Sequence, residues 1–174
     1  SLEAVRAFVS NGGGQLDGAI TFYEDDVPLL GRLCAEFKWV GNTYTTALHT
    51  RDKWRMQERL RSCGLPAIEE KLLKTKADLE EAITTIGFPA VMKPLWGYDS
   101  QFVLYIDNAE DARNAYQYLI KTCTADYDPI YKFNKRLFVY QEFIDGPEFS
   151  LECYSQYGVP HVVGIHEKRP KKLP

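Results

Sequence analysis

The chain has 174 residues, of which 45% are hydrophobic and 13% aromatic, and this is enough to bury one sizeable core or two small ones. A formal net charge of -3 gives no basic excess of the kind that nucleic-acid binders carry, so we expect no nucleic-acid partner. The apolar runs are too short to cross a bilayer and we identify no cleavable signal, so we expect no membrane partner and a cytoplasmic location.

The first segment is expected to be the end of an open α/β domain. Residues 17–22 predict a short strand, and the apolar positions between Leu29 and Phe37 predict a helix. The acidic run Glu24-Asp25-Asp26 precedes this helix, where the helix dipole favours negative charge. We therefore expect these residues to cap the helix rather than to hold a metal or a substrate. A further short helix is predicted over residues 43–48.

The next helix pattern is predicted to begin at Thr50, as its N-cap, and to end before Gly64 and Pro66. Lys53 lies in the first turn of this helix, where a cation opposes the helix dipole. Two interpretations of Lys53 stay open. It is an exposed lysine that tolerates a small energetic cost, or it lies beside an anion.

The rest of the chain predicts a small sheet covered by helices, an α+β arrangement, followed by the start of a second sheet. Strands are predicted within 65–73, over 90–94 and 102–106, and from 138 onward, with helices capped by Thr75 and Asn108. Residues 124–135 are predicted as a linker, and residues 148–154 and 160–166 as a hairpin. The inward positions of the two helices are Leu79, Ala82, Ile83 and Ile86 in the first and Ala112, Ala115, Tyr116 and Leu119 in the second.

The four cysteines and three histidines show no metal-ligand or disulfide-framework spacing. We expect the cysteines to be buried free thiols and the histidines to be structural or to lie on the surface. The basic run that begins at Lys168 is expected to be a solvated tail.

Lys93 closes an apolar strand and is followed at once by Pro94 and a turn that contains Gly97 and Ser100. A lysine at a strand end often extends to solvent, but here the proline and the turn restrict where the ammonium group points. The arrangement favours contact with a phosphate, with the Ser100 hydroxyl and nearby backbone N–H groups as further donors. A single glycine makes this loop a weak phosphate-binding signal by itself.

The segment from Gln141 through Glu142 and Phe143 to Ile144 continues a strand into the turn Asp145-Gly-Pro, and Glu148 follows. A plain strand entering a tight turn would have the same pattern. The functional interpretation is a hinge whose backbone pairs with the edge of a purine. Glu148 then accepts hydrogen bonds from ribose hydroxyls, because an ionised carboxylate offers two acceptor oxygens.

Three motifs together resemble the ATP-grasp superfamily of ligases, which includes D-alanine–D-alanine ligase, biotin carboxylase and carnosine-synthase-like amino-acid ligases. They are Arg51-Asp52-Lys53, Val91-Met-Lys93-Pro94 and the stretch from Gln141 to Glu148. The resemblance implies that Lys53 and Lys93 meet ATP phosphates and that the loop after Lys93 covers them. It also implies that the Gln141 or Glu142 carbonyl accepts from the adenine amino group, Ile144 N–H donates to ring N1, and Glu148 binds ribose.

The resemblance further implies three segments: residues 1–48 as the C-terminal part of the preceding α/β domain, 49–141 as the small lobe of the ATP-grasp fold, and 142–174 as the start of the large lobe. It implies ATP and Mg²⁺ as cofactors, with the Mg²⁺ ligands expected beyond Pro174. The 174 residues are therefore expected to be a fragment without turnover of its own.

The expected activity of the parent protein is ATP-dependent activation of a small carboxylate as an acyl phosphate, which is then coupled to an amine. Two alternatives stay open: a non-catalytic nucleotide-binding or interaction module, and a bicarbonate-using enzyme of the same superfamily, of the carboxylase or carbamoyl-phosphate type. Homo-oligomerisation is also left open.

Overall fold

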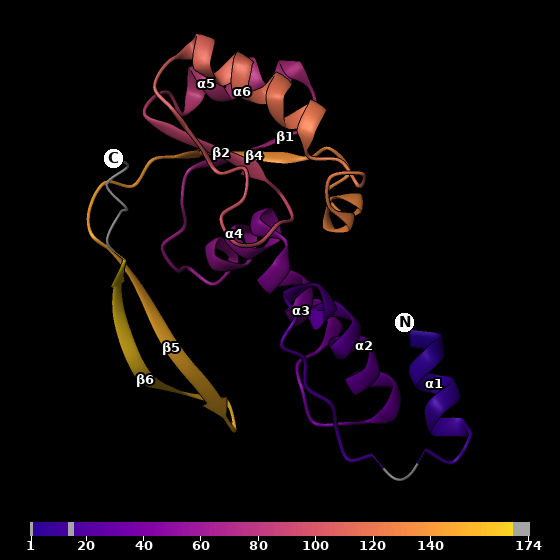
Figure 1. Cartoon of the computed structure of the whole chain (residues 1–174). Helices are drawn as coiled ribbons and strands as arrows, with labels where there is room; N and C mark the ends of the chain where they lie inside the picture. The colour runs from indigo at the N-terminus through magenta and orange to yellow at the C-terminus, as the bar shows by residue number, and fades with distance from the viewer. Residues whose placement is uncertain (1, 14–15, 169–174) are drawn as a thin grey trace. The chain divides into compact units, whose positions relative to one another are not determined.

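The computed structural model describes residues 2–13 and 16–168, and the chain divides into two compact units, residues 1–143 and 144–174. The first unit contains a four-stranded antiparallel sheet and its helices (Figure 1). The second contains a two-stranded hairpin. Most of the predicted basic tail after Lys168 lies outside the described residues, and the three predicted segments stay a prediction.

The sheet of the first unit has the strand order β1-β4-β2-β3. Its strands are β1 (Glu70–Leu73), β2 (Ala90–Pro94), β3 (Leu104–Ile106) and β4 (Phe138–Glu142). β4 pairs with β1 on one side and with β2 on the other. The last of these four strands in the sequence is therefore an inner strand of the sheet. This placement puts the predicted hinge at the end of a fully paired strand.

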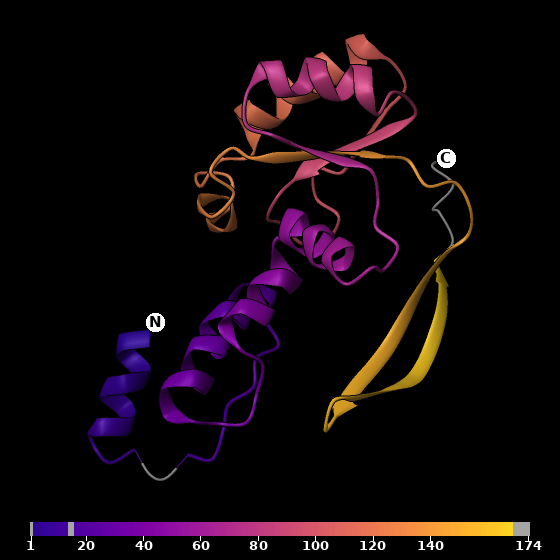
Figure 2. The same cartoon turned by 180° about the vertical axis from the view of Figure 1, so that it is seen from behind.

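Two helices, α5 (Lys76–Thr85) and α6 (Ala109–Thr122), cover one face of the sheet, as Figures 1 and 2 both show. The predicted caps are confirmed, because the Thr75 side chain accepts from Asp78 N–H and the Asn108 side chain accepts from Asp111 N–H. The core between the sheet and these helices is formed by buried side chains from both. Along each element these buried residues are interspersed with exposed ones. The core includes Leu73, Met92, Phe138, Tyr140, Leu79, Ala82, Ala112, Tyr116 and Leu119.

The N-terminal part of the first unit is helical. It contains α1 (Leu2–Ser10), the 3-10 helix η1 (Glu24–Asp26), α2 (Val27–Phe37), α3 (Tyr44–Arg51) and α4 (Lys53–Ser62). α2 and α3 approach closely at Gly31, where an added Cβ would lie 3.0 Å from the Tyr44 Cα atom. Only glycine fits there without a shift of the backbone.

The predicted strand at residues 17–22 is wrong. The segment is irregular and mostly exposed, with Ile20 and Phe22 79% and 91% exposed. A strand needs a neighbour to pair with its N–H and C=O groups, and none of the described residues provides one there. The local apolar pattern was correct for a strand, but the pairing partner is absent.

The acidic run does not cap α2, contrary to the prediction. Asp26, the residue before the helix, forms no side-chain capping bond. Instead, the buried Arg51 side chain forms ion pairs with Glu24 and Asp25. The predicted N-cap Thr50 is also wrong, because α3 continues through Arg51 and the Asp52 side chain caps α4 by accepting from Arg55 N–H.

Residues 124–135 are not a linker. They contain the 3-10 helix η2 (Pro129–Lys132), and Ile130, Tyr131 and Asn134 are each at most 3% exposed. The prediction gave weight to the polar and proline content of the segment and missed its apolar side chains, which pack into the core.

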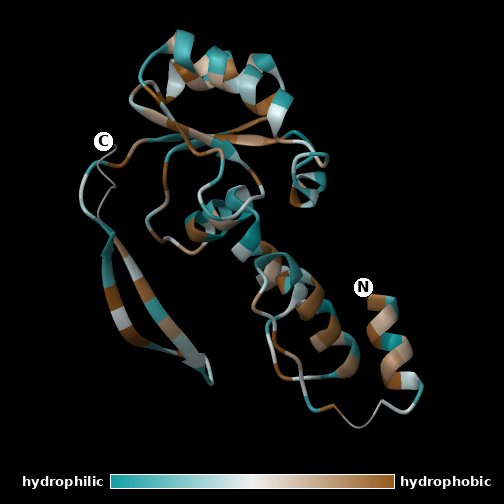
Figure 3. Ribbon diagram, in the orientation of Figure 1, coloured by the Kyte–Doolittle hydropathy of each residue, from teal (hydrophilic) through white to brown (hydrophobic). Residues whose placement is uncertain are grey.

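The hairpin of the second unit consists of β5 (Glu148–Gln156) and β6 (Val159–Lys168), which confirms the predicted turn and strands. Its apolar side chains are exposed on both strands, and Figure 3 shows them as separate hydrophobic positions along the ribbon. Cys153 in β5 and Cys63 after α4 are exposed free thiols. The prediction of buried thiols therefore holds only for Cys34 and Cys123.

Candidate nucleotide-binding site

Three polar residues of the sheet, Glu70, Lys93 and Gln141, lie on the face opposite α5 and α6. Side chains alternate between the two faces of a strand. The register pairs Gln141 with Glu70 and with Val91, and Val139 with Lys93, so these side chains share one face. α4 lies on this side of the sheet in Figures 1 and 2. Lys53, in the first turn of α4, and Lys93, in β2, therefore lie on the same side of the sheet.

Lys53 is the first residue of α4 and is partly buried. Its backbone N–H and its Nζ atom both lie 3.4 Å from the Leu95 carbonyl oxygen. Its pKa is lowered to about 8, mainly by burial and in addition by the positive charges of Lys93 and Arg51. The interpretation of Lys53 as an exposed lysine is therefore wrong, since its ammonium group is desolvated and placed among other cations.

Lys93 is also partly buried, and burial lowers its pKa, which the Glu70 carboxylate partly offsets. Neither Lys53 nor Lys93 forms a salt bridge with a carboxylate among the described residues. Two desolvated lysines that repel each other are costly unless an anion completes the site. This electrostatic arrangement suits a polyanion.

The loop after Lys93 is held by contacts with the segment at 127–134. The Asn134 side-chain oxygen accepts from Trp96 N–H at 3.1 Å, and Tyr98 Oη donates to Asp128 at 2.6 Å. The Phe102 ring packs edge-on against two tyrosine rings, with centroids 5.0 and 5.6 Å away. The loop that is predicted to cover the phosphates is therefore anchored at both ends.

Ser100 lies exposed in the middle of this loop, and its backbone adopts a left-handed conformation with φ of 55°. Asp99 and Phe102 do the same, at 52° and 57°. Such conformations cost free energy for residues with a Cβ atom. The carboxylate of the preceding residue, Asp99, is unfavourable for an anion, so Ser100 as a phosphate donor stays a prediction with no supporting contact.

The backbone of the predicted hinge is partly used by the sheet. Phe143 N–H donates to the Pro89 carbonyl and Glu142 N–H donates to the Glu69 carbonyl, at 3.1 and 3.0 Å. In an antiparallel ladder, this pattern makes Gln141 and Val91 a hydrogen-bonded pair. The Gln141 carbonyl is thereby occupied, which favours Glu142 among the two carbonyls predicted to meet adenine.

Ile144 and Glu148 belong to the second unit, and the two lysines belong to the first. The Glu148 side chain is exposed and forms an ion pair of 2.6 Å with Lys168. The ribose role of Glu148 and the N1 role of Ile144 stay predictions.

The prediction from sequence missed Glu70 and Asn134, and it assigned the N-cap of α4 to Thr50 instead of Asp52. Glu70 has a fully buried side chain in β1, where it accepts from the Gln141 amide at 2.5 Å. No local pattern distinguishes it, because its strand has the sequence Glu-Lys-Leu-Leu and also contains the polar Lys71. The contribution of Asn134 depends on a contact 38 residues away, which no local pattern reveals.

No group of three or more His, Cys, Asp or Glu residues in 2–13 and 16–168 could hold a metal ion. No helix in the same ranges is long and apolar enough to span a membrane.

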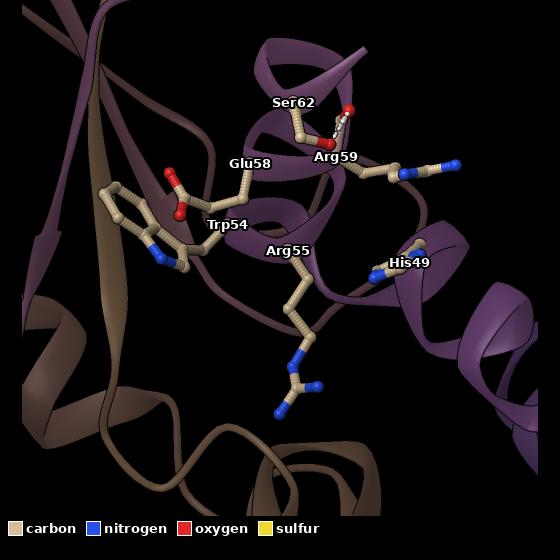
Figure 4. A pocket seen from close by; sticks show the side chains of 6 residues that line it. All are labelled: His49, Trp54, Arg55, Glu58, Arg59 and Ser62. Atoms are coloured by element: carbon tan, nitrogen blue, oxygen red, sulfur yellow. Dashed lines mark hydrogen bonds between the residues drawn. The ribbon is translucent and has the colours of Figure 1, made fainter.

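An open hollow of about 600 Å³ lies over α3 and α4. Figure 4 shows its lining, where the Ser62 hydroxyl donates to the Arg59 carbonyl. It contains none of the predicted site residues. Its residues are His49, Trp54, Arg55, Glu58, Arg59 and Ser62.

The chain is similar to several known ligases. It is 24% identical over 167 residues to alanine–anticapsin ligase of Bacillus subtilis, which covers 89% of this chain and 35% of that protein. It is 24% identical to D-alanine–D-alanine ligase of Pseudomonas putida, over 93% of this chain and 47% of that protein. The chain thus spans less than half the length of these relatives.

Solved structures agree with this similarity. The L-amino acid ligase of Bacillus licheniformis matches with a TM-score of 0.80 and 28% identity, over 98% of this chain and 39% of that chain. The fold is also shared with N5-carboxyaminoimidazole synthetase of Staphylococcus aureus complexed with ADP, with a TM-score of 0.73 and 17% identity over 98% of this chain and 42% of that chain. The family model for the ATP-grasp domain matches residues 86–174, just over half of the chain. The chain belongs to the ATP-grasp domain family.

Proposed function

We propose that this chain supplies the nucleotide-binding part of an ATP-dependent ligase that activates a carboxylate as an acyl phosphate and couples it to an amine. The observation that carries the proposal is the pair of desolvated lysines, Lys53 and Lys93, without a carboxylate salt bridge among the described residues. A triphosphate supplies the negative charge that this pair lacks.

In the proposed reaction, a carboxylate oxygen attacks the terminal phosphorus of ATP, ADP leaves, and the amine then displaces phosphate from the acyl phosphate. Phosphoryl transfer depends on positioning and charge neutralisation. Lys53 and Lys93 hold the phosphates and offset their charge. Mg²⁺ supplies further neutralisation when bound, but the described residues offer no cluster that fits it. We therefore assign none of the described residues to Mg²⁺.

The base is proposed to lie at the end of β4. The Glu142 carbonyl accepts from the 6-amino group, and Ile144 N–H, which follows the last ladder bond at Phe143, donates to ring N1. Glu148 is proposed to bind the ribose hydroxyls, in exchange for its ion pair with Lys168.

Amino-acid substrates are favoured over bicarbonate by the 28% identity to an L-amino acid ligase. Biotin carboxylases share the fold at 17–19% identity, which supports the fold alone. A nucleotide-binding module without catalysis is the second alternative. The proposed location is cytoplasmic, where ATP is supplied.

The substrate class is tested by ADP release from the full-length protein with Mg²⁺-ATP and a panel of amino acids, compared with bicarbonate. We expect ADP formation that depends on an amino acid. Dependence on bicarbonate would support the carboxylase alternative, and ATP binding without ADP release would support the binding module.

Substitution of Lys53 or Lys93 by Ala should weaken the binding of ATP far more than the binding of adenosine, because only contacts with phosphates are removed. Titration calorimetry of the full-length protein with both ligands measures this. Lys74→Ala, an exposed lysine after β1, is the matched control and should change neither affinity. Equal losses for ATP and adenosine would contradict the assignment.

ATP affinity should fall as pH rises above the pKa of Lys53, about 8 in the free protein. ATP favours the charged lysine, so binding above this pH requires proton uptake. The affinity is then nearly constant below about pH 8 and weakens by up to about tenfold per unit above it. Calorimetry in buffers with different ionisation enthalpies measures the proton uptake.

The control for the pH dependence is Lys53→Arg, because arginine keeps its charge throughout this pH range. The ATP affinity of this variant should no longer show the part of the pH dependence that comes from Lys53. This holds whatever the absolute affinity of the variant is. An unchanged slope in Lys53→Arg would show that another group titrates.

Glu148→Ala should weaken the binding of ATP and of adenosine to the same extent. It should leave the binding of 2′,3′-dideoxy-ATP unchanged, because this nucleotide lacks the ribose hydroxyls that donate to the carboxylate. Glu152→Ala, an exposed glutamate in the same strand, is the control. If the affinity for the dideoxy nucleotide falls as much as that for ATP, Glu148 does not contact the ribose.

A further inference from the structure

The buried carboxylate of Glu70 has no role in the proposed reaction, yet it lies beside the predicted hinge. Its side chain is 0% exposed, and its Oε1 atom has no hydrogen-bond partner. The nearest cation to Oε1 is Arg61 of α4, at 3.7 Å, too far for a hydrogen bond. A buried, incompletely satisfied carboxylate is costly, so its presence in this strand calls for a reason.

The partner of Glu70 is the side chain of Gln141. The two residues face each other across β1 and β4. Glu142 N–H donates to the Glu69 carbonyl, so Glu70 and Gln141 form the non-hydrogen-bonded type of pair, in which side chains lie closest. Gln141 Nε2 donates to Glu70 Oε2 at 2.5 Å.

This hydrogen bond fixes which way the Gln141 amide points. An ionised carboxylate only accepts hydrogen bonds, so it binds the NH₂ group and not the carbonyl of an amide. The Gln141 Oε1 atom is therefore turned away from Glu70, and none of the described residues donates to it. The neighbouring residue, Glu142, has the carbonyl that we assign to the 6-amino group of the base.

We propose that Glu70 is a positioning residue for base specificity, which holds the Gln141 amide so that its oxygen accepts from the second hydrogen of a purine 6-amino group. This inference rests on the proposed function. A 6-amino group has two hydrogens and satisfies both acceptors. A 6-oxo purine presents an oxygen to them, and Gln141 can only offer its NH₂ group by turning its oxygen toward the Glu70 carboxylate.

The test compares ATP with ITP, which carries a 6-oxo group, in the full-length protein. Glu70→Gln removes the constraint, because two amides pair in either orientation. We expect ITP to bind about tenfold more tightly than in the wild type, since the charge-assisted bond no longer opposes the turn of the amide. ATP affinity should change by no more than about twofold, because the orientation that accepts from its amino group stays available.

A gain of affinity for ITP distinguishes positioning from a structural role, because a loosened fold would weaken both nucleotides. Glu69→Gln, an exposed neighbour in the sequence, is the matched control and should leave both affinities unchanged. The exchanged variant, Glu70→Gln with Gln141→Glu, keeps the charge and the hydrogen bond. Its carboxylate at position 141 accepts only, so ITP affinity should return to the wild-type value or below.

The wild-type protein provides a measurement that needs no variant. Burial raises the pKa of Glu70. The charged groups that face it are Arg61 and Glu58 from α4 and Lys93 from β2. Protonation lets Glu70 donate to the amide oxygen, so the affinity for ITP relative to ATP should rise as pH falls through this pKa. The same ratio should be flat in Glu70→Gln.

An unchanged ITP affinity in Glu70→Gln, together with a ratio that does not vary with pH in the wild type, would overturn the inference. An ITP affinity above the wild-type value in the exchanged variant would also overturn the inference. If instead ATP binding is absent or does not depend on Lys93, the proposed nucleotide site fails, and that result is separate from the response to Glu70.

Discussion

The burial of two lysines on one face of a small sheet is the constraint on which the candidate site depends. Lys53 reaches this face because Asp52 caps α4 and the first turn of the helix lies against the Leu95 carbonyl. Lys93 reaches it because the alternation of β2 directs Met92 and Pro94 into the core. The sheet and the helix cap therefore bring together two like charges, at a cost in free energy that a bound anion would offset.

The inner position of β4 links the phosphate end of the site to the base end. Its pairing with β2 places Val139 opposite Lys93, and its pairing with β1 places Gln141 opposite Glu70. The same strand ends in the hinge, where Phe143 makes the last ladder bond before the second unit begins. One register thus fixes both the lysine that we propose to meet phosphate and the amide that we propose to lie beside the base, and a slip of one residue would exchange the two faces.

Local patterns were enough for most of the sheet lobe. The spacing of Leu79 and Ala82, the caps Thr75 and Asn108 and the strand 90–94 all depend on neighbours within a few residues, so their sequence signals are direct. The strand at 17–22 failed because pairing depends on a partner that the local sequence does not specify. The acidic run at Glu24 failed because its ion pair with Arg51 spans 27 residues.

The site shows the same division. The positions of Lys53 and Lys93 in their elements followed from sequence, but their desolvation depends on α4 packing against a sheet that forms from distant strands. Glu70 was invisible for a further reason. Its environment is made by Gln141, 71 residues away, and by Arg61 of α4. A glutamate in a strand is ordinarily a solvated residue, and only the register turns this one into a buried acceptor that constrains an amide.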